Sequence, residues 1–524
     1  MHRLRFLLFA LAFLARPAFA ADAIDRTIDR MSDDEKIAQL LMVGFDGTRV
    51  SPDLRMLVSQ WHAGGIVLYR QNIQSARQAA QRNAEIRALA AGNVEPFIAV
   101  DQEGGLVQRL RDGVPELPGN MALGATRSPR LARRAGRALA QSLRALGFTM
   151  NFAPVLDVLW NPENTVFLTR SFSDDPHLAA RLGRAFVRGA NEGGIISVAK
   201  HFPGEGGTAG DSHFALPVLD SDRNAMDSCE LVPFRAAIAA HLPALMTGHI
   251  AVPRIAEEPG LPATISRRVL TDLLRHDLRF NGLVITDELQ MPSIRSRASV
   301  GDLAVEAILA GADMIMVVWD HHDRDEIYDA LRRAYASGEL PRATVRRSLR
   351  RILILKRRLK IQRRTSDDRS IANEIATRSV ALARRDSGPL YDAGRSVVML
   401  GSDGPLRRQF PAATIIEPPR RLDPTTFDAT IDSAVIACRG ATTLIAVIGS
   451  DNDKRLARAL RKRLPLIRFI VVALGSPFEV RDIPKPDAIL FTWSSGWPSQ
   501  EAAARVLRGR AKARGRIPVE ISLP

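Results

Sequence analysis

The chain has 524 residues, of which 46% are hydrophobic and 25% are charged. This composition is that of a folded globular protein and excludes a disordered chain, and the length points to two or three domains. The net charge of +16 favours contact with an anionic polymer such as cell-wall material. The basic runs lack interleaved aromatic side chains, which argues against nucleic acid as a partner.

The first segment of the chain has the pattern of a cleavable signal peptide over residues 1–20. Two arginines precede an apolar run over residues 6–14, and Ala18-Phe19-Ala20 forms a small-residue cleavage site. The run is too short to span a bilayer stably, and no other segment is long and apolar enough to do so. We therefore expect a periplasmic or secreted protein, cut near Ala20, with no transmembrane segment.

Short apolar runs then alternate with helical segments. Eight runs are expected to be strands: residues 40–45, 65–69, 97–100, 149–155, 195–199, 244–248, 283–286 and 314–317. Eight strands alternating with helices predict a (β/α)₈ barrel of buried parallel strands over residues 21–363. Ser32 to Glu35 has the spacing of a capping box, which predicts the start of an early helix.

Polar residues follow five of these runs at their carboxyl ends. They are Asp101-Gln102-Glu103, Asp157, Lys200-His201, His249 and Asp287-Glu288. A barrel builds its active site at this rim from several strands. Residues that merely end solvated loops would not favour this end, so the clustering predicts one shared pocket.

The pattern changes after the barrel. A basic run over residues 347–364 is expected to form a helix with one packed and one solvated face. A linker is predicted over residues 364–394, followed by a smaller α/β domain over residues 395–524. Its expected strands are residues 397–400, 443–448, 469–474 and 488–493. Cys229 and Cys438 are the two cysteines, and both a disulfide and two free thiols stay open.

The most informative motif is the stretch KHFPGEGGTAGDSH, from Lys200 to His213. It runs from a strand into a loop whose glycines give the backbone freedom. Asp211 lies two residues before His213, and a carboxylate at that spacing can fix the tautomer of an imidazole and stabilise its protonated form. The segment therefore suggests a site that holds a polar substrate and moves protons.

With these residues placed, nearly all of the mature chain resembles glycoside hydrolase family 3, and specifically its bacterial exo-β-N-acetylglucosaminidases (β-hexosaminidases) of the two-domain type. The resemblance rests on VDQEGG at residues 100–105 with Gln108-Arg109, NFAPVLD at 151–157, Arg170-Ser171-Phe172, the motif at 200–213, Ile285-Thr286-Asp287 and GRIPV at 515–519. It implies a (β/α)₈ barrel followed by an α/β sandwich domain.

The resemblance also implies a retaining mechanism that releases terminal β-linked N-acetylglucosamine from cell-wall fragments or chitin oligosaccharides. Asp287 would be the nucleophile, and His213, oriented by Asp211, the acid and base. Histidine suits both proton transfers near neutral pH, and its neutral form places no second anion beside Asp287. The residues implied to hold the terminal sugar are Asp101, Arg109, Arg170, Lys200 and His201. One departure is Glu205, where the family commonly has histidine; Glu205 could itself compete as proton donor.

Other readings stay open at this stage. A family 3 β-glucosidase or xylosidase would not need the Asp-His pair, and a non-catalytic periplasmic sugar-binding protein would also have two α/β domains. Transfer to phosphate instead of water is a further possibility, and Glu288 beside Asp287 resembles the acidic pair of substrate-assisted hexosaminidases. Asp320 to Asp323 (DHHD) suggests either a metal site or the polar start of a helix, the second being favoured. The expectation is that the protein uses no metal and no nucleotide cofactor.

Overall fold

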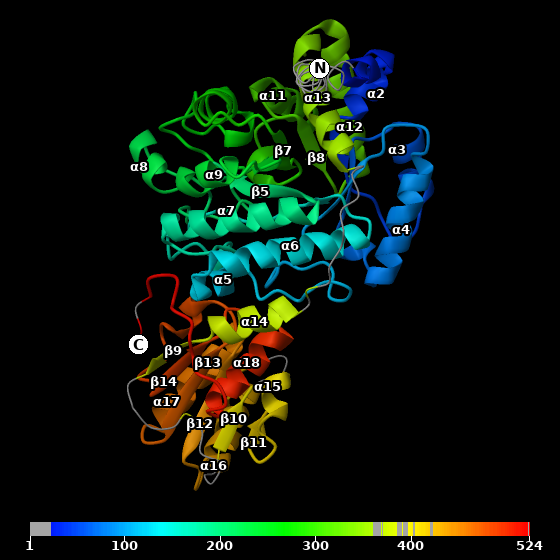
Figure 1. Ribbon diagram of the computed structural model, residues 1–524. Coiled ribbons are helices and arrows are strands. Elements are labelled where there is room, and N and C mark those ends of the chain that lie inside the picture. Colours follow the sequence, from blue (N-terminus) through cyan, green and yellow to red (C-terminus); the bar gives the residue numbers. More distant parts are fainter. Residues whose placement is uncertain are drawn as a thin grey trace, which may run out of the picture.

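The computed structural model describes residues 23–359, 368, 370–384, 390, 397–401, 404–419, 423–521 and 523. The expected signal peptide lies outside these residues. Two units follow each other along the chain, with the barrel above and the smaller unit below in Figure 1. Within the described ranges, no helix combines the length and the apolar character that crossing a bilayer requires.

The first unit is a closed barrel of eight parallel strands in the order β1 to β8, with β8 paired to β1. The strands are β1 Leu41–Val43, β2 Gly65–Leu68, β3 Phe97–Val100, β4 Met150–Asn151, β5 Ile196–Phe202, β6 Ala244–Thr247, β7 Leu283–Glu288 and β8 Met314–Val317. The (β/α)₈ prediction is confirmed. Three strands differ most from the prediction. β4 is much shorter than the expected run over residues 149–155, whereas β5 and β7 extend past their predicted ends and so carry Lys200, His201 and Asp287 on the strands themselves.

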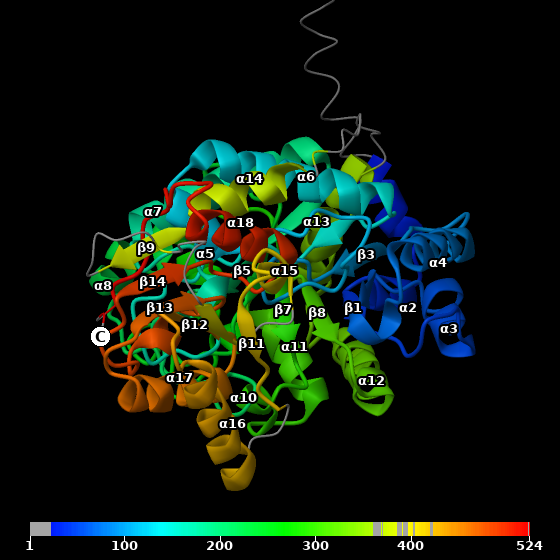
Figure 2. The same cartoon turned by 90° about the horizontal axis from the view of Figure 1, so that it is seen from below.

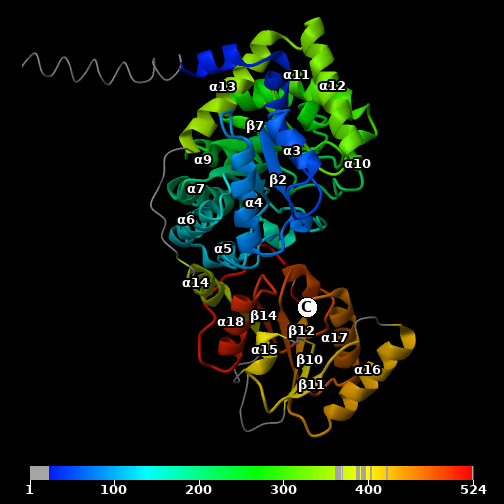
Figure 3. The same ribbon diagram turned by 90° about the vertical axis from the view of Figure 1, so that its right-hand side faces the viewer.

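Helices surround the barrel on its outside, as Figure 3 shows for α3, α4, α6 and α7. They are α2 Asp33–Ala38, α3 Pro52–Ser59, α4 Ala76–Leu89, α5 Asn120–Thr126, α6 Pro129–Ala145, α7 Pro176–Gly193, α8 Arg223–Ser228, α9 Leu231–Ile238, α10 Pro292–Arg295, α11 Val300–Ala310, α12 His321–Ser337 and α13 Arg342–Leu359, with a π-helix, η4, at Arg268–Asp277 and 3₁₀ turns η1 Arg70–Asn72, η2 Leu168–Arg170 and η3 Ala263–Ile265. Ser32 and Glu35 form the predicted capping box of α2. Residues 347–359 of the basic run lie in α13, with Leu349, Ile352 and Leu353 buried, and residues 360–364 lie outside the described residues.

The second unit is a six-stranded sheet in the order β11-β10-β12-β13-β14-β9. Its strands are β9 Ala381–Arg384, β10 Val397–Leu400, β11 Thr414–Ile416, β12 Thr443–Ile448, β13 Arg468–Ala473 and β14 Ala488–Phe491. Its helices are α14 Ser370–Ser379, α15 Pro405–Arg408, α16 Pro424–Ala437, α17 Asp451–Arg463 and α18 Trp497–Leu507, with the 3₁₀ turn η5 Pro477–Val480.

The structure differs from the predicted linker over residues 364–394. This range contains α14 and β9, and β9 pairs antiparallel with β14 at the edge of the second sheet. Trp493 is fully buried, and its indole N–H donates to the carbonyl of Ser379, 2.7 Å away, which ties the end of α14 to the sheet. The second unit therefore begins before residue 395.

The two units contact each other through α5, α6, α14 and the C-terminal tail, which lie close together in Figures 1 and 2. The backbone N–H of Arg516 donates to the carbonyl of Ala125 at 3.0 Å. At Gly515, a Cβ atom would lie 2.0 Å from the carbonyl oxygen of Ser379, so only glycine fits there. The tail thereby packs α5 against the second unit.

The two cysteines are free. Cys229 follows α8 in the barrel, and Cys438 ends α16 in the second unit. The structure therefore favours the two-thiol alternative over a disulfide.

Candidate active site

The carboxyl ends of the barrel strands enclose a cavity of about 430 Å³. All of its lining side chains belong to the barrel within the described residues. Among them are seven of the eight site residues expected from the sequence: Asp101, Arg109, Arg170, Lys200, His201, His213 and Asp287. Asp211 adjoins the cavity through its contact with His213. One pocket therefore brings together residues from four segments that are far apart in the chain, namely 101–109, 170, 200–213 and 287.

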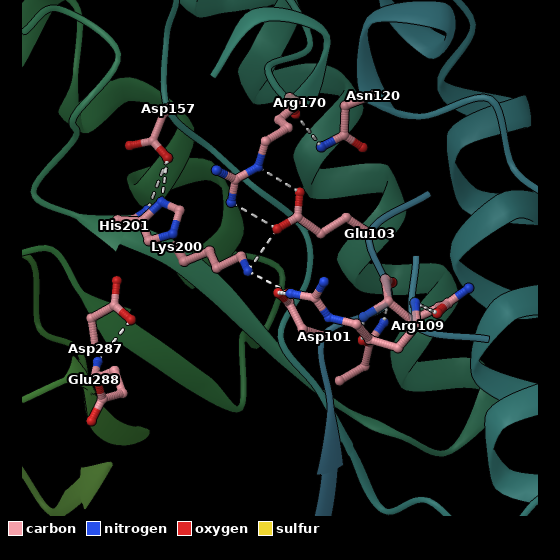
Figure 4. Close-up of polar contacts among 12 residues, drawn as sticks. Asp101, Glu103, Arg109, Asn120, Asp157, Arg170, Lys200, His201, Asp287 and Glu288 are labelled. Atoms are coloured by element: carbon pink, nitrogen blue, oxygen red, sulfur yellow. Dashed lines mark hydrogen bonds and ion pairs between the residues drawn. The ribbon is translucent and has the colours of Figure 1, made fainter. Parts of the chain in front are cut away.

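A network of five charged side chains forms one wall of the cavity (Figure 4). The Lys200 ammonium group lies 2.7 Å from a carboxylate oxygen of Asp101 and 2.7 Å from one of Glu103. Arg109 pairs with the other oxygen of Asp101 at 2.9 Å. Arg170 donates two hydrogen bonds to Glu103, at 2.8 and 3.0 Å.

The contacts of this network keep Glu103 and Lys200 charged. Burial alone would raise the pKa of Glu103, but Arg170 and Lys200 outweigh that effect, and the pKa lies far below its ordinary value. Burial would likewise lower the pKa of Lys200, but Asp101 and Glu103 raise it. Three cations and two anions give the wall charged groups suited to the hydroxyl and amide groups of a sugar.

His201 lies between this wall and Asp287. Its Nδ1 lies 2.8 Å from Oδ2 of Asp157, and its backbone N–H donates to the same oxygen at 3.1 Å. Asp157 therefore fixes the orientation of the imidazole ring, which also packs edge-on against Phe167. The other nitrogen of the ring is left to face the cavity.

Asp287 lies at the end of β7, across the cavity from the charged wall in Figure 4. Burial would raise its pKa, but the nearby His201, the backbone N–H of Glu288 and Lys200 lower it below the ordinary value. The N–H of Glu288 donates to Oδ1 of Asp287 at 2.8 Å. Asp287 is therefore an ionised carboxylate at neutral pH, as a nucleophile must be.

The adjacent Glu288 has the opposite character. It is buried, and burial together with the charge of Asp287 raises its pKa to about 8. Two neighbouring carboxyl groups with separated pKa values are typical of an active site. Glu288 is thus neutral while Asp287 is charged.

The loop after β5 carries the Asp211–His213 pair. Nδ1 of His213 lies 2.7 Å from Oδ1 of Asp211, and the backbone N–H of His213 donates to the same oxygen. This contact fixes the imidazole and leaves its Nε2 for a ligand. The side chain of His213 is 63% exposed, so it lies at the mouth of the cavity.

Glycines allow the base of this loop to pack tightly. A Cβ atom at Gly206 would lie 2.2 Å from the carbonyl oxygen of Val158, and one at Gly207 would lie 2.3 Å from the ring of Trp160. The amide of Asn164 donates to the carbonyl groups of Glu205 and Thr208, both at 3.0 Å. The glycine-rich part of the motif is therefore a packed segment.

The predicted rim also contained residues whose importance the sequence did not single out. Glu103 and Asp157 were placed at the rim, but their partners, Arg170 and His201, come from distant segments. The mouth is lined by Tyr69 and Trp319, whose rings lie 4.9 Å apart, and Trp319 is 53% exposed. No local pattern links these two side chains.

The choice between a metal site and a helix start at residues 320–323 is resolved in favour of the helix. Asp320 caps α12, its side chain accepting a hydrogen bond from the backbone of His322. Over the described part of the chain, no group of three or more histidine, cysteine or acidic side chains is arranged to hold a metal ion. The expectation of no cofactor stays a prediction.

Comparison with known protein families shows which family this barrel belongs to. The model of the glycosyl hydrolase family 3 N terminal domain matches residues 32–355, more than half of the chain. The chain belongs to glycosyl hydrolase family 3. As a member of this family the protein is a glycoside hydrolase, and the resemblance found in the sequence is confirmed.

Relatives of this family 3 enzyme are similar to it over both the barrel and the second unit. It is 29% identical to Beta-hexosaminidase A of Pseudoalteromonas piscicida over 91% of this chain and 92% of that protein. It is 38% identical to a Beta-hexosaminidase of Alkalilimnicola ehrlichii over 53% of this chain and 80% of that one. The structure of a family 3 beta-N-acetylglucosaminidase from Paenibacillus sp. str. FPU-7 matches with a TM-score of 0.86 and 33% identity, covering 94% of this chain and all of that one.

Proposed function

We propose that this family 3 enzyme is a retaining exo-β-N-acetylhexosaminidase that releases terminal non-reducing β-linked N-acetylglucosamine. The observation that carries the proposal is the presence of ionised Asp287 and the Asp211–His213 pair at one cavity. The names of the relatives, beta-hexosaminidase and beta-N-acetylglucosaminidase, support the same substrate class.

The reaction would proceed in two displacements. Asp287 attacks the anomeric carbon while Nε2 of His213 gives its proton to the leaving oxygen, and a glycosyl ester forms on Asp287. His213, now neutral, takes a proton from water, which attacks the anomeric carbon and frees the sugar. Asp211 stabilises the imidazolium form in both steps. The net result is hydrolysis with retention of the β configuration.

The charged wall would hold the terminal sugar. Asp101, Arg109 and Lys200 present charge-assisted hydrogen bonds to hydroxyl groups, and His201 faces the nucleophile. Arg170 is engaged by Glu103 through two hydrogen bonds, so we assign it to shaping the wall as well as to sugar contact. A cavity of about 430 Å³ suits one terminal sugar, consistent with exo action.

The natural substrate and location complete the proposal. Cell-wall fragments carrying terminal N-acetylglucosamine, or chitin oligosaccharides, suit an exported basic enzyme, and we propose a role in peptidoglycan turnover in the periplasm or outside the cell. The support is the signal-peptide pattern of residues 1–20 and the net charge of +16.

The test compares nitrophenyl β-N-acetylglucosaminide with the matching β-glucoside, following the anomer first released by NMR. Preference for the N-acetylated substrate with initial release of the β-anomer is expected. Preference for the glucoside would point to a β-glucosidase, and initial release of the α-anomer would exclude a glycosyl-enzyme. Binding of N-acetylglucosamine without turnover of either substrate would support a sugar-binding protein. Parallel assays in phosphate and phosphate-free buffer would show whether a glycosyl phosphate forms.

A further inference from the structure

Glu205 is a buried acid in the cavity wall that the proposed mechanism does not use. It is 2% exposed and lies in the loop between β5 and His213. Its backbone is held on both sides: the N–H donates to Oδ1 of Asp157 at 2.7 Å, and the carbonyl accepts from Asn164 at 3.0 Å. These contacts fix where the side chain starts.

The carboxyl group of Glu205 lies next to the side chain of Ser212, and both residues line the cavity. Ser212 lies between Asp211 and His213 and is 4% exposed, although both of its neighbours are much more exposed. Ser212 is therefore the point at which this part of the loop is anchored in the cavity wall. Among the described residues, Oε1 of Glu205 has no hydrogen-bond partner.

Charged groups from three elements face the carboxyl group of Glu205. Asp157 follows β4, Asp287 is the last residue but one of β7, and Arg170 ends η2. Burial, followed by the charges of Asp157 and Asp287, raises the pKa of Glu205 well above its ordinary value, although Ser212 and Arg170 oppose the shift. A neutral carboxylic acid can donate and accept a hydrogen bond with Ser212 without adding another anion beside Asp287.

We propose that Glu205 is a positioning residue for proton transfer: by binding Ser212, its carboxyl group holds the Asp211–His213 pair at the mouth of the cavity. This inference rests on the proposed role of His213 as acid and base. It differs from the alternative in which Glu205 itself donates the proton, because a positioning residue acts through His213 and needs no ionisation of its own.

The experiment compares two substrates whose need for an acid differs. A dinitrophenyl β-N-acetylglucosaminide has a leaving group that departs unaided, whereas chitobiose needs a proton. General acid catalysis contributes roughly 10²–10⁴-fold, and its partial misplacement should cost about tenfold. We therefore expect Glu205→Ala and Ser212→Ala each to slow chitobiose about tenfold and the dinitrophenyl glycoside less than about threefold.

The double variant tests whether the two residues act as a unit. Since either change removes the same proposed contact between the two side chains, the double variant should be no more than about twofold worse than the worse single variant. Glu163→Ala, an exposed glutamate in the neighbouring loop, is the matched control and should leave both rates unchanged. Fully additive losses, or equal losses on both substrates, would overturn the proposal.

Glu205→Gln separates positioning from proton donation. The amide is neutral and keeps a donor and an acceptor, so it should restore most of the chitobiose activity that Glu205→Ala loses. It also removes the ionisation of Glu205, which adds a negative charge near Asp287 as the pH rises, so the variant should keep activity to a higher pH than the wild type. Loss as deep as in His213→Ala would identify Glu205 as the proton donor and overturn the proposal.

His213→Ala distinguishes failure of this inference from failure of the proposed function. If His213→Ala loses chitobiose activity selectively while the Glu205 and Ser212 variants do not, only the positioning role is wrong. If His213→Ala shows no selectivity between the substrates, the acid–base assignment itself is wrong. Should Glu205→Ala not fold, Ser212→Ala and Glu205→Gln decide the question.

Discussion

Glu103 pairs with the buried Lys200 and the largely buried Arg170, and the variant Glu103→Gln tests how much this network stabilises the barrel. Its carboxylate is 3% exposed, contacts Lys200 at 2.7 Å and binds Arg170 through two hydrogen bonds. Removing one partner from a buried ion pair costs roughly 3–5 kcal/mol, because the remaining charge is left uncompensated. Glutamine keeps the shape and one oxygen acceptor, so we expect a loss of about 3 kcal/mol.

Thermal unfolding measures this loss. A domain of this size shifts its Tm by roughly 2 °C per kcal/mol, so Glu103→Gln should unfold about 6 °C below the wild type at neutral pH. The control is Glu192→Gln, which removes a mostly exposed pair with Arg133 and should change Tm by less than about 2 °C.

The pH dependence has a defined sign. Because the pKa of Glu103 is depressed in the folded protein, its contribution is present above the ordinary glutamate pKa and declines as the pH falls below it. The difference in Tm between wild type and Glu103→Gln should therefore shrink on acidification. An equal Tm for both proteins at neutral pH would refute the view that Glu103 holds the network together.

Three further variants probe the cavity. Asp287→Ala should lower kcat by at least about 10⁴-fold on both substrate classes, since no other group replaces the nucleophile; residual activity within tenfold would contradict this. Glu288→Gln should extend the alkaline limb of the kcat/KM profile beyond pH 8, because it removes a carboxyl group with a pKa of about 8 that adds a second negative charge beside Asp287 when it ionises. An unchanged profile would show that the ionisation of Glu288 does not affect kcat/KM. Trp319→Ala should raise KM for chitotriose about fivefold, because the exposed ring of Trp319 can stack on a second sugar, but it should leave KM for methyl β-N-acetylglucosaminide unchanged. Equal changes in KM for the two substrates would count against stacking.

Much of the barrel could be predicted because its strands are buried on both faces. Such strands appear as short apolar runs, and β3 and β8 have the predicted limits in the structure. The ends of β5 and β7 were missed because charged residues there, Lys200 and Asp287, interrupt the apolar pattern. These residues continue the strands since their side chains point into a polar cavity, which local hydrophobicity does not reveal.

The second unit was predicted less completely. Its four central runs were found, but β9 and β11 were not. β9 is a short edge strand whose pairing with β14 brings together residues about a hundred positions apart. Its residues Ala381-Leu382-Ala383 show no alternation of apolar and polar side chains from which a strand could be predicted. β11 is likewise an edge strand, and its residues are only partly buried. Edge strands carry a weak hydrophobic pattern because one side of each faces solvent.

The contacts of the candidate site were likewise only partly predictable from the sequence. The Asp211–His213 contact is local, so the spacing of two residues predicts it. The bonds of Glu103 to Arg170 and of Asp157 to His201 join segments 67 and 44 residues apart, and only the closed barrel brings them together. The same is true of the contact between Tyr69 and Trp319.

The most direct test of the two-displacement mechanism is to trap the glycosyl-enzyme. A 5-fluoro analogue of N-acetylglucosaminyl fluoride slows breakdown of such an ester, so that mass spectrometry of the intact protein and its peptides can locate the sugar. We expect one added sugar, attached to the peptide at Asp287 and absent from Asp287→Ala. A sugar on Glu288 or Glu205, or turnover of the analogue with no adduct at any time, would contradict the assignment of the nucleophile.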